Sequence, residues 1–373
     1  MNDLRKIVYG GEIFLPETIE EIENIVKGNA HIRIGNANAE GVIISLEKLD
    51  KILEINREKK EVYLETGIVL SDLQKRLEKY NLELPIDILF KETIQIGQLL
   101  ALNSSGKKGI KYGKIGDWVK EIEIIDSEGN LVKVGKTDLS DFLGMEGITG
   151  IMVRARLKLI NKIRRTASLL KIEKIENVVE SVKKIKLMQN VSMICFFDKQ
   201  SSELLGLDRN YHLLIEFESE KGNLKNGKYK EILEIQRKLY DQLCLLGNTK
   251  LEDIKLFLDK LPDFIKYTEN NKIPVFGSLG TGILHPVLNE KDDSLDILKN
   301  VKRIRGKVYG DFGSKNKKEF FDDNDIKLIK RMKQRNDPIN KFNKGVMIDF
   351  EDGKIETTDR NRKISNDDLN SNN

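Results

Sequence analysis

Four glycine-containing segments follow one another between residues 97 and 151, and they constrain the fold of this chain more than any other feature. The first covers residues 97–106, the second residues 109–119, the third begins at 122–124, and the fourth covers residues 142–151. Glycine has no side chain, so the backbone there can turn sharply or approach another group closely. Each segment alone is typical of an ordinary turn, but four in one order are informative together.

The pattern around these segments predicts a mixed α and β region over the first 160 residues. Thr18 followed by Glu21 forms a capping box, and the apolar spacing that follows predicts a helix that Gly28 ends. Strict alternation of apolar and charged residues predicts strands. The predicted strands cover residues 32–34, 42–46, 62–66 and 151–159, and residues 122–134 are predicted to form a hairpin.

The pattern changes at about residue 165. Strands are predicted at 169–172, 193–197, 213–217 and 275–276, with helices at 175–185 and 232–243. This βαββαβ order is the ferredoxin-like arrangement, so we expect a second domain at 165–300. One more helix is predicted at 323–335, and the polar, aperiodic residues 351–373 are expected to form a disordered tail.

Composition excludes several classes of protein. Of 373 residues, 64 are Lys or Arg and 60 are Asp or Glu, and the charges are interleaved, which argues against a nucleic-acid partner. The two cysteines, Cys195 and Cys244, have no paired spacing, so neither a disulfide framework nor a cysteine-based metal cluster is expected. No apolar run reaches membrane-spanning length, and we expect no transmembrane segment and a cytoplasmic location.

A short loop after the strand at 32–34 is a candidate anion site. It reads Gly35-Asn36-Ala37-Asn38, and small residues there would let successive backbone N–H groups surround a phosphate. The signal is weak, because a loop with one glycine is usually only a turn. The chain also lacks the Gly-x-Gly-x-x-Gly sequence of a Rossmann unit.

Read in order, the four segments resemble the FAD-binding domain of the vanillyl-alcohol oxidase and p-cresol methylhydroxylase superfamily. The similarity is best to its glycolate, D-lactate and D-2-hydroxyglutarate dehydrogenase branch, and it continues more faintly through residues 270–348. The resemblance implies an α+β fold. It consists of a two-part FAD-binding domain, residues 1–160 with a C-terminal return at 301–350, and a ferredoxin-like cap at 165–300.

The resemblance also implies cofactor-binding roles residue by residue. The pyrophosphate loop would run from Arg33 to Asn38, and the remaining positions would line the flavin, its chain or its adenosine end. The implied residues are Arg33, Gly35, Asn36, Ala37, Asn38, Pro85, Gly97, Asn103, Ser104, Gly106, Gly113, Asp117, Glu146, Gly147, Gly150 and Ile151. Some relatives attach FAD through a histidine in the first loop. This loop has none, since His31 precedes Arg33, so non-covalent FAD is expected.

The second half departs from the family pattern at the chemically important places. Residues 277–286 resemble the family's Gly-His-x-Gly-Asp-Gly-Asn-Leu-His, but Ser278 replaces the first histidine and only His285 is kept. Residues 310–313 resemble Gly-Glu-His-Gly, with Phe312 in place of the histidine. Neither serine nor phenylalanine ligates metal or accepts a proton near neutral pH as imidazole does. We therefore expect no metal site, and His285 is the candidate catalytic base.

Three functions remain open. The first is an FAD-dependent dehydrogenase or oxidase that acts on a small 2-hydroxy acid such as glycolate or lactate, by hydride transfer to flavin N5. Its electrons would leave to a quinone, a partner protein or oxygen. The second is a non-catalytic FAD-binding subunit of a larger oxidoreductase, which the missing histidines favour. The third is the NADPH-linked reductase that makes UDP-N-acetylmuramate, whose loop pattern differs.

Overall fold

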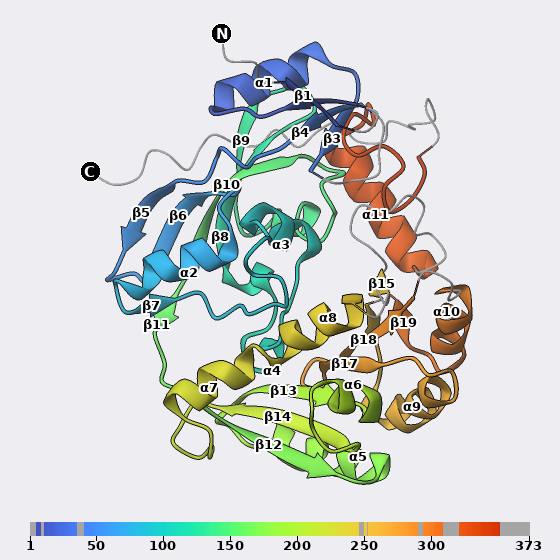
Figure 1. The fold of residues 1–373 in the computed structure, drawn as a ribbon. Helices are drawn as coiled ribbons and strands as arrows, with labels where there is room; N and C mark the ends of the chain where they lie inside the picture. Colours follow the sequence, from blue (N-terminus) through green and yellow to red (C-terminus); the bar gives the residue numbers. More distant parts are fainter. Residues whose placement is uncertain are drawn as a thin grey trace.

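The computed structural model describes residues 5–8, 11–35, 41–245, 250–251, 253–289, 294–308 and 321–350. Two bodies are visible in Figure 1. The upper one contains the N-terminal sheets and the last helix, and the lower one is built on a single large antiparallel sheet. The segment that leads from one body to the other passes through β11 (Ile160–Asn161) into β12 (Thr166–Ile172).

The N-terminal sheet has four strands in the order β1-β2-β4-β3. They are β1 (Arg5–Val8), β2 (Gly11–Phe14), β3 (Ile32–Ile34) and β4 (Val42–Ile44). The predicted helix is present as α1 (Ile19–Gly28), and the Thr18 hydroxyl accepts a 3.2 Å hydrogen bond from the Glu21 N–H. The Glu21 carboxylate caps the N–H of Glu17 at 2.8 Å, one residue earlier than a strict capping box requires.

A five-stranded antiparallel sheet in the order β5-β6-β10-β8-β9 forms the centre of the upper body. Its strands are β5 (Ile52–Asn56), β6 (Glu61–Glu65), β8 (Val119–Ile125), β9 (Leu131–Val134) and β10 (Ile151–Lys158). The predicted hairpin is confirmed, with Ile122 opposite Val134. Helices α2 (Leu70–Glu78) and α3 (Ile96–Leu102) bury their leucines against this sheet.

Short elements connect the upper body to the sheet below. The two-residue strand β7 (Leu82–Glu83) pairs with β11. After α3 the chain forms α4 (Gly109–Tyr112), the 3-10 turn η1 (Ile115–Trp118) and, beyond β9, η2 (Leu139–Asp141). Figure 1 shows α4 reaching down from the upper body to the large sheet, where it packs against β13.

The large sheet has the strand order β12-β14-β13-β17-β18-β16-β19, and β15 also pairs with β18. Besides β12, its strands are β13 (Val191–Phe197), β14 (Tyr211–Phe217), β15 (Lys250–Leu251), β16 (Ile254–Lys255), β17 (Val275–Ser278), β18 (Ile283–Leu288) and β19 (Lys307–Val308). The four predicted strands are all present. They correspond to β12, β13, β14 and β17, and they form only part of a larger sheet in which β17 pairs with β13. The sheet also continues past residue 300, where we expected it to end.

Helices cover both faces of this sheet, because its central strands are apolar on both faces: β13 and β14 are buried at every position. One face packs against α5 (Ile175–Lys186), α9 (Leu261–Asn270) and α10 (Ser294–Arg303), and η3 (Leu258–Lys260) precedes α9. The other packs against α6 (Lys199–Leu204), α7 (Asn226–Leu233) and α8 (Ile235–Leu245). The single helix predicted at 232–243 is therefore two helices, which meet at Glu234.

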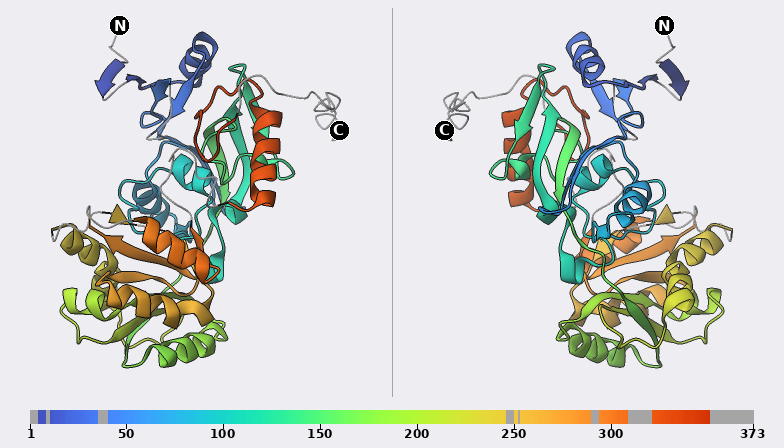
Figure 2. Two further views of the ribbon diagram at one scale, coloured as in Figure 1. Left: turned by 90° about the vertical axis from the view of Figure 1, so that its right-hand side faces the viewer. Right: turned by 90° about the vertical axis from the view of Figure 1, so that its left-hand side faces the viewer.

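The C-terminal part returns to the upper body, as Figure 2 shows. The predicted helix is confirmed as α11 (Asp323–Asn336), and its Ile329 packs in one apolar cluster with Met145 and Ile148. Phe342 then forms a parallel bridge with Ile32 of β3. Within the described residues no helix is long and apolar enough to cross a membrane. Cys195 is buried and forms no disulfide, and the side chain of Cys244 lies outside what the structure describes.

Candidate functional site

The turn after β3 leaves a hydrogen-bond donor and open backbone. Arg33 is partly buried, and its Nε has no hydrogen-bond partner among the described residues. Gly35 has φ +59°, and a Cβ built there would meet nothing within 4 Å. A buried guanidinium nitrogen without a partner is costly in a folded protein, so this position suits an anionic group. Asn36, Ala37 and Asn38 lie outside the described residues.

Asn343 ties this turn to the fourth glycine segment. Its side-chain oxygen accepts a 2.8 Å hydrogen bond from the N–H of Ile34, and its side-chain nitrogen donates to the carbonyl of Glu146 at 2.8 Å. Gly147 has φ +73°, and a Cβ there would lie 3.0 Å from the Asn343 Nδ2 and 3.2 Å from the Ile34 Cδ1. The C-terminal return thus holds two predicted cofactor segments side by side.

The C-terminal end of α3 joins the same group. The N–H of Glu146 donates to the carbonyl of Ala101 at 3.0 Å. Asn103 ends the helix in the left-handed conformation, with φ 48°, and its side-chain oxygen accepts a 3.0 Å hydrogen bond from the N–H of Gly116. The carbonyl of Ser104 accepts from the N–H of Ile115 at 2.8 Å. The predicted residues 103–104 therefore contact both the second and the fourth segments.

Gly106 and Gly113 are both required as glycines by this packing. A Cβ at Gly106 would lie 2.4 Å from the carbonyl oxygen of Asp87, in the loop that starts at the buried Pro85. At Gly113, with φ +68°, a Cβ would lie 2.2 Å from Asp117 Oδ2. That oxygen accepts a 2.8 Å hydrogen bond from the N–H of Lys114. These contacts bring Asp87, two residues after Pro85, next to Gly106, and Gly113 next to Asp117.

Three predicted positions lie deeper. The N–H of Gly97 donates to the carbonyl of Thr66 at 2.7 Å, so the start of α3 is fixed to the end of β6. Gly150 precedes β10 and packs against Phe142. Ile151 pairs with Ile125 and is buried in the core between the two upper sheets. The cofactor roles of these residues, like those of the other predicted positions, remain predictions.

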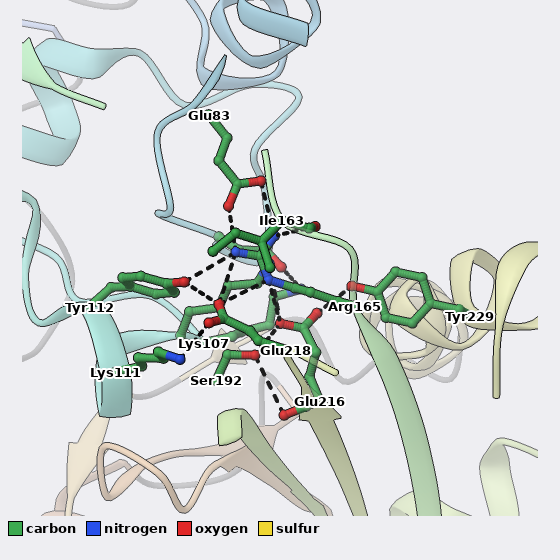
Figure 3. A network of polar contacts seen from close by, with 12 residues as sticks. Glu83, Lys107, Lys111, Tyr112, Ile163, Arg165, Ser192, Glu216, Glu218 and Tyr229 are labelled. Atoms are coloured by element: carbon green, nitrogen blue, oxygen red, sulfur yellow. Dashed lines mark hydrogen bonds and ion pairs between the residues drawn. The ribbon is translucent and has the colours of Figure 1, made fainter. Parts of the chain in front are cut away.

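A buried polar network lies where the upper body meets the large sheet, and Figure 3 shows it. Its centre is Arg165, whose side chain is 5% exposed. The guanidinium donates to both carboxylate oxygens of Glu83, from β7, and to Glu218, which directly follows β14, at 3.1 Å. It also reaches the Tyr112 hydroxyl at 3.3 Å. Burial lowers the pKa of Arg165, but Glu83 more than offsets this and raises it.

A second carboxylate, Glu216, completes the network and is fully buried. It accepts hydrogen bonds from the hydroxyls of Ser192 at 2.6 Å and Tyr229 at 2.5 Å. Its Oε1 lies 3.3 Å from Lys108 Nζ, and Arg165 Nε is 3.5 Å away. Glu216 lies near the end of β14 and Glu218 directly follows it, and both carboxylates contact Arg165.

The charges in this network balance. Four cations, from Lys107, Lys108, Lys111 and Arg165, face four carboxylates, from Glu83, Asp87, Glu216 and Glu218. Burial would raise the pKa of Glu218, but hydrogen bonds from Lys111 and Tyr112 and the charge of Arg165 hold it below its usual value. Balanced charges keep the burial of eight ionisable groups tolerable.

Sequence reasoning missed most of this network, although one signal was available. Glu216 is a lone carboxylate in the otherwise apolar run of β14. A charged residue is almost never fully buried unless it is paired, so a carboxylate at this position predicts a buried cation nearby. The identity of that cation depends on tertiary contacts with α4 and β12, which no local pattern contains.

His285, the predicted catalytic base, lies in β18 beside Phe276, with ring centroids 5.3 Å apart. Its Nδ1 is 2.7 Å from Asp253 Oδ1, a partner that the sequence did not suggest. A carboxylate on one ring nitrogen fixes the ring and leaves the other nitrogen for a proton. Ser278 lies on the neighbouring strand, and its hydroxyl reaches the carbonyl of Lys107 at 3.4 Å.

The expectation of no metal site stays a prediction. Among the described residues no three His, Cys, Asp or Glu side chains gather in a way that could hold a metal ion. Asp311 and Phe312 lie outside the described residues.

The chain is similar to known proteins in two ways. Residues 14–135 match the family described as "FAD binding domain". The chain is 24% identical to a D-2-hydroxyglutarate dehydrogenase of Stutzerimonas stutzeri (strain A1501), over 76% of this chain and 75% of that protein. It is 32% identical to a D-lactate dehydrogenase of Anaerostipes hadrus, over 38% of this chain and 32% of that protein. These matches confirm the family resemblance inferred from the four segments.

Further similarities are more limited. A glycolate oxidase subunit of Bacillus subtilis (strain 168) is 28% identical over 39% of this chain, and the match spans only 33% of that subunit. Among solved structures, an alkyldihydroxyacetonephosphate synthase shares the fold with a TM-score of 0.62, at 17% identity, over 89% of this chain and 77% of that chain. The structural similarity therefore concerns the fold.

Proposed function

Because residues 14–135 carry an FAD-binding domain, we propose that this chain is an FAD-dependent oxidoreductase that oxidises a small 2-hydroxy acid. The relatives named for D-2-hydroxyglutarate, D-lactate and glycolate support this substrate class. The observation that carries the proposal most directly is the assembly of the first, second and fourth glycine segments and the β3 turn into one connected group around Asn103, Glu146 and Asn343.

The described residues fit FAD in that group. The Arg33 Nε that has no partner and the open backbone at Gly35 suit the negative charge of a pyrophosphate. Gly106 and Gly113 keep the backbone free of side chains where the resemblance places the flavin and its chain. The first loop contains no histidine, so the proposed attachment is non-covalent.

We propose that the large sheet is the cap and that the substrate lies between it and the upper body. The cap would begin at about residue 165 with the ferredoxin-like element order, and the FAD-binding domain would consist of residues 1–160 together with the C-terminal return. The sheet face that carries Cys195, Phe276 and His285 is also the face that carries Glu216. Lys108, from the upper body, meets Glu216 there.

The reaction needs a hydride acceptor and a proton acceptor. Bound FAD supplies the first, since its flavin takes a hydride from the carbon that bears the hydroxyl. His285 is the candidate for the second: with Nδ1 held by Asp253, Nε2 is left to accept the hydroxyl proton. Asp253 would orient the ring and stabilise it when it becomes charged.

One observation favours a second function, a non-catalytic FAD-binding subunit. Ser278 occupies the position of a family histidine and faces a backbone carbonyl, so one expected imidazole is missing from the interface. In addition, every cation of the Arg165 network already has a carboxylate partner.

Anaerobic titration of the purified protein separates these functions. A yellow protein whose colour enters the supernatant after acid precipitation contains non-covalent FAD. Bleaching by glycolate, D- or L-lactate, or D-2-hydroxyglutarate supports the oxidoreductase, and His285→Gln should slow the bleaching while Asp259→Asn, on exposed η3, leaves it unchanged. A flavin that no hydroxy acid bleaches indicates the non-catalytic subunit. Bleaching by NADPH alone, or a protein that takes up no FAD, overturns the proposal.

A further inference from the structure

A small groove opens on the cap where α5 ends and η3 begins. Its volume is about 190 Å³, and its floor is apolar, with Leu256 and Leu279 among the lining residues. Lys186, Lys255 and Phe257 also line it. We call this feature the lysine-rimmed groove. No carboxylate is among its lining residues.

Two large apolar side chains at the groove are exposed. Phe257 is 69% exposed and lines the groove, and Leu187 is 85% exposed and follows Lys186 directly in sequence. Exposed apolar surface costs about 25 cal/mol per Å² relative to burial. Single exposed leucines are common on monomers, but an aromatic and a leucine beside one concave site are typical of protein-binding surfaces.

The two charged residues that line the groove, Lys186 and Lys255, are both cations. Lys183, Lys184 and Lys186 fall in the last turns of α5, and Lys255 is on the strand opposite. None of these four lysines forms an ion pair within the part of the chain that the structure describes, and burial lowers the pKa of Lys186. Lysines favour a helix C-terminus through the helix dipole. That effect accounts for the α5 lysines, but not for Lys255 or for the exposed Phe257.

The groove also adjoins the segment predicted to line the flavin. Thr281, which lines the groove, has its Cγ2 2.7 Å from where a Cβ of Gly109 would lie. The carbonyl of Gln189, two residues after Leu187, accepts a 3.4 Å hydrogen bond from Lys111 Nζ. Gly109 and Lys111 belong to α4, between the predicted cofactor residues Gly106 and Gly113. One residue that lines the groove, Thr281, therefore contacts the segment between Gly106 and Gly113.

We propose that the lysine-rimmed groove is the docking site of an acidic electron-carrier protein that reoxidises the flavin. The lysine rim would pair with carboxylates of the carrier, and Phe257 and Leu187 would supply the buried centre of the interface. This inference rests on the proposed oxidoreductase function. Oxidation of one hydroxy acid to the 2-oxo acid releases two electrons and two protons. Two one-electron carriers each take one electron, and the protons pass to solvent.

The test uses a small acidic [2Fe–2S] ferredoxin as the probe and the FAD-loaded full chain. Binding to the oxidised ferredoxin is measured by calorimetry or interferometry, which needs no turnover. Phe257→Ala should weaken binding about thirtyfold, as expected for an aromatic at an interface centre. The pair Lys186→Glu and Lys255→Glu should weaken it further, with most of the effect lost at high salt. Matched controls are Leu328→Ala, and Lys327→Glu with Lys330→Glu, all exposed on α11.

Reduction of a small dye by the hydroxy acid separates the two proposals. If the groove variants reduce the dye normally but bind oxidised ferredoxin poorly, the docking site is supported. If ferredoxin does not bind, or if the groove variants bind it as tightly as the controls do, the docking proposal is wrong, whatever the dye assay gives. If no hydroxy acid supports dye reduction, the proposed function fails, and the binding measurement still decides the docking surface.

Discussion

Replacing Lys333 by methionine should remove about 3 to 5 kcal/mol from the free energy of unfolding, because one partner of a buried ion pair is lost. Lys333 is 2% exposed, and its Nζ donates to Asp337 at 2.5 Å and to the carbonyls of Ile148 and Phe342, each at 2.8 Å. Methionine fills a similar volume without a donor. It therefore leaves a buried carboxylate and two carbonyls without this partner, and each orphaned acceptor costs about 1 to 3 kcal/mol.

The loss should reach the cofactor site as well. Asp337 also accepts hydrogen bonds from the N–H groups of Lys341 and Phe342, so the Lys333 contacts fix the segment that places Asn343 between Ile34 and Glu146. We expect the variant to unfold at lower denaturant and to lose FAD more readily on dilution.

The assay is urea denaturation followed by circular dichroism, with flavin fluorescence recorded in parallel. Lys330→Met, on the exposed side of the same helix, is the matched control and should change stability by less than about 0.5 kcal/mol. Asp337→Asn added to Lys333→Met should restore part of the loss, because it removes the unpaired charge. A loss below about 1 kcal/mol for Lys333→Met would refute this account of the contact.

Three further outcomes are expected from single substitutions. Arg33→Gln should raise the dissociation constant of FAD, whereas Arg57→Gln on the surface should not, as flavin fluorescence during dilution will show. Asp198 is fully buried, which raises its pKa from 3.8 to about 7. The stabilisation that this raised pKa provides is therefore fully present below pH 3.8 and is lost as pH rises to about 7. Asp198→Asn should remove this slope of up to about 1.4 kcal/mol per pH unit. The measurement is the difference in the free energy of unfolding between variant and wild type from pH 4 to 8. Arg165→Met should destabilise the protein by about 3 kcal/mol or more, since it leaves buried carboxylates unpaired. An unchanged midpoint in thermal unfolding would contradict this.

Local signals explain what the sequence could predict. Thr18 and the apolar face after it were sufficient for α1, and the turn between the two strands at 122–134 was sufficient for the hairpin. Gly106 and Gly113 have positive φ, and a Cβ at either position would clash with a neighbouring atom, so the backbone requires glycine there. The glycine residues in the sequence therefore marked these two turns. The order of these signals carried the family resemblance.

The cap could be predicted only in part, because its outer strands have almost no local signal. Strands β16 and β19 contain two residues each and pair only with each other and with β18. An alternation of two residues has no period to recognise. The two helices at 226–245 have a common apolar side, and the break at Glu234 between them has neither a proline nor a glycine to mark it.

The Arg165 network bears on the choice between the two candidate functions, and only the folded chain reveals it. A hydroxy acid brings its own carboxylate into the interface, where each cation already has a carboxylate partner. Binding there means either displacing Glu216 or Glu218 from a cation or burying a charge without a partner, and the second costs several kcal/mol. A catalytic chain that binds its substrate at this network, as proposed, would have to rearrange it, whereas a non-catalytic subunit could keep it closed. Since the network also joins β7 and α4 to the strands of the large sheet, such a rearrangement at Arg165 would loosen the large sheet from the upper body.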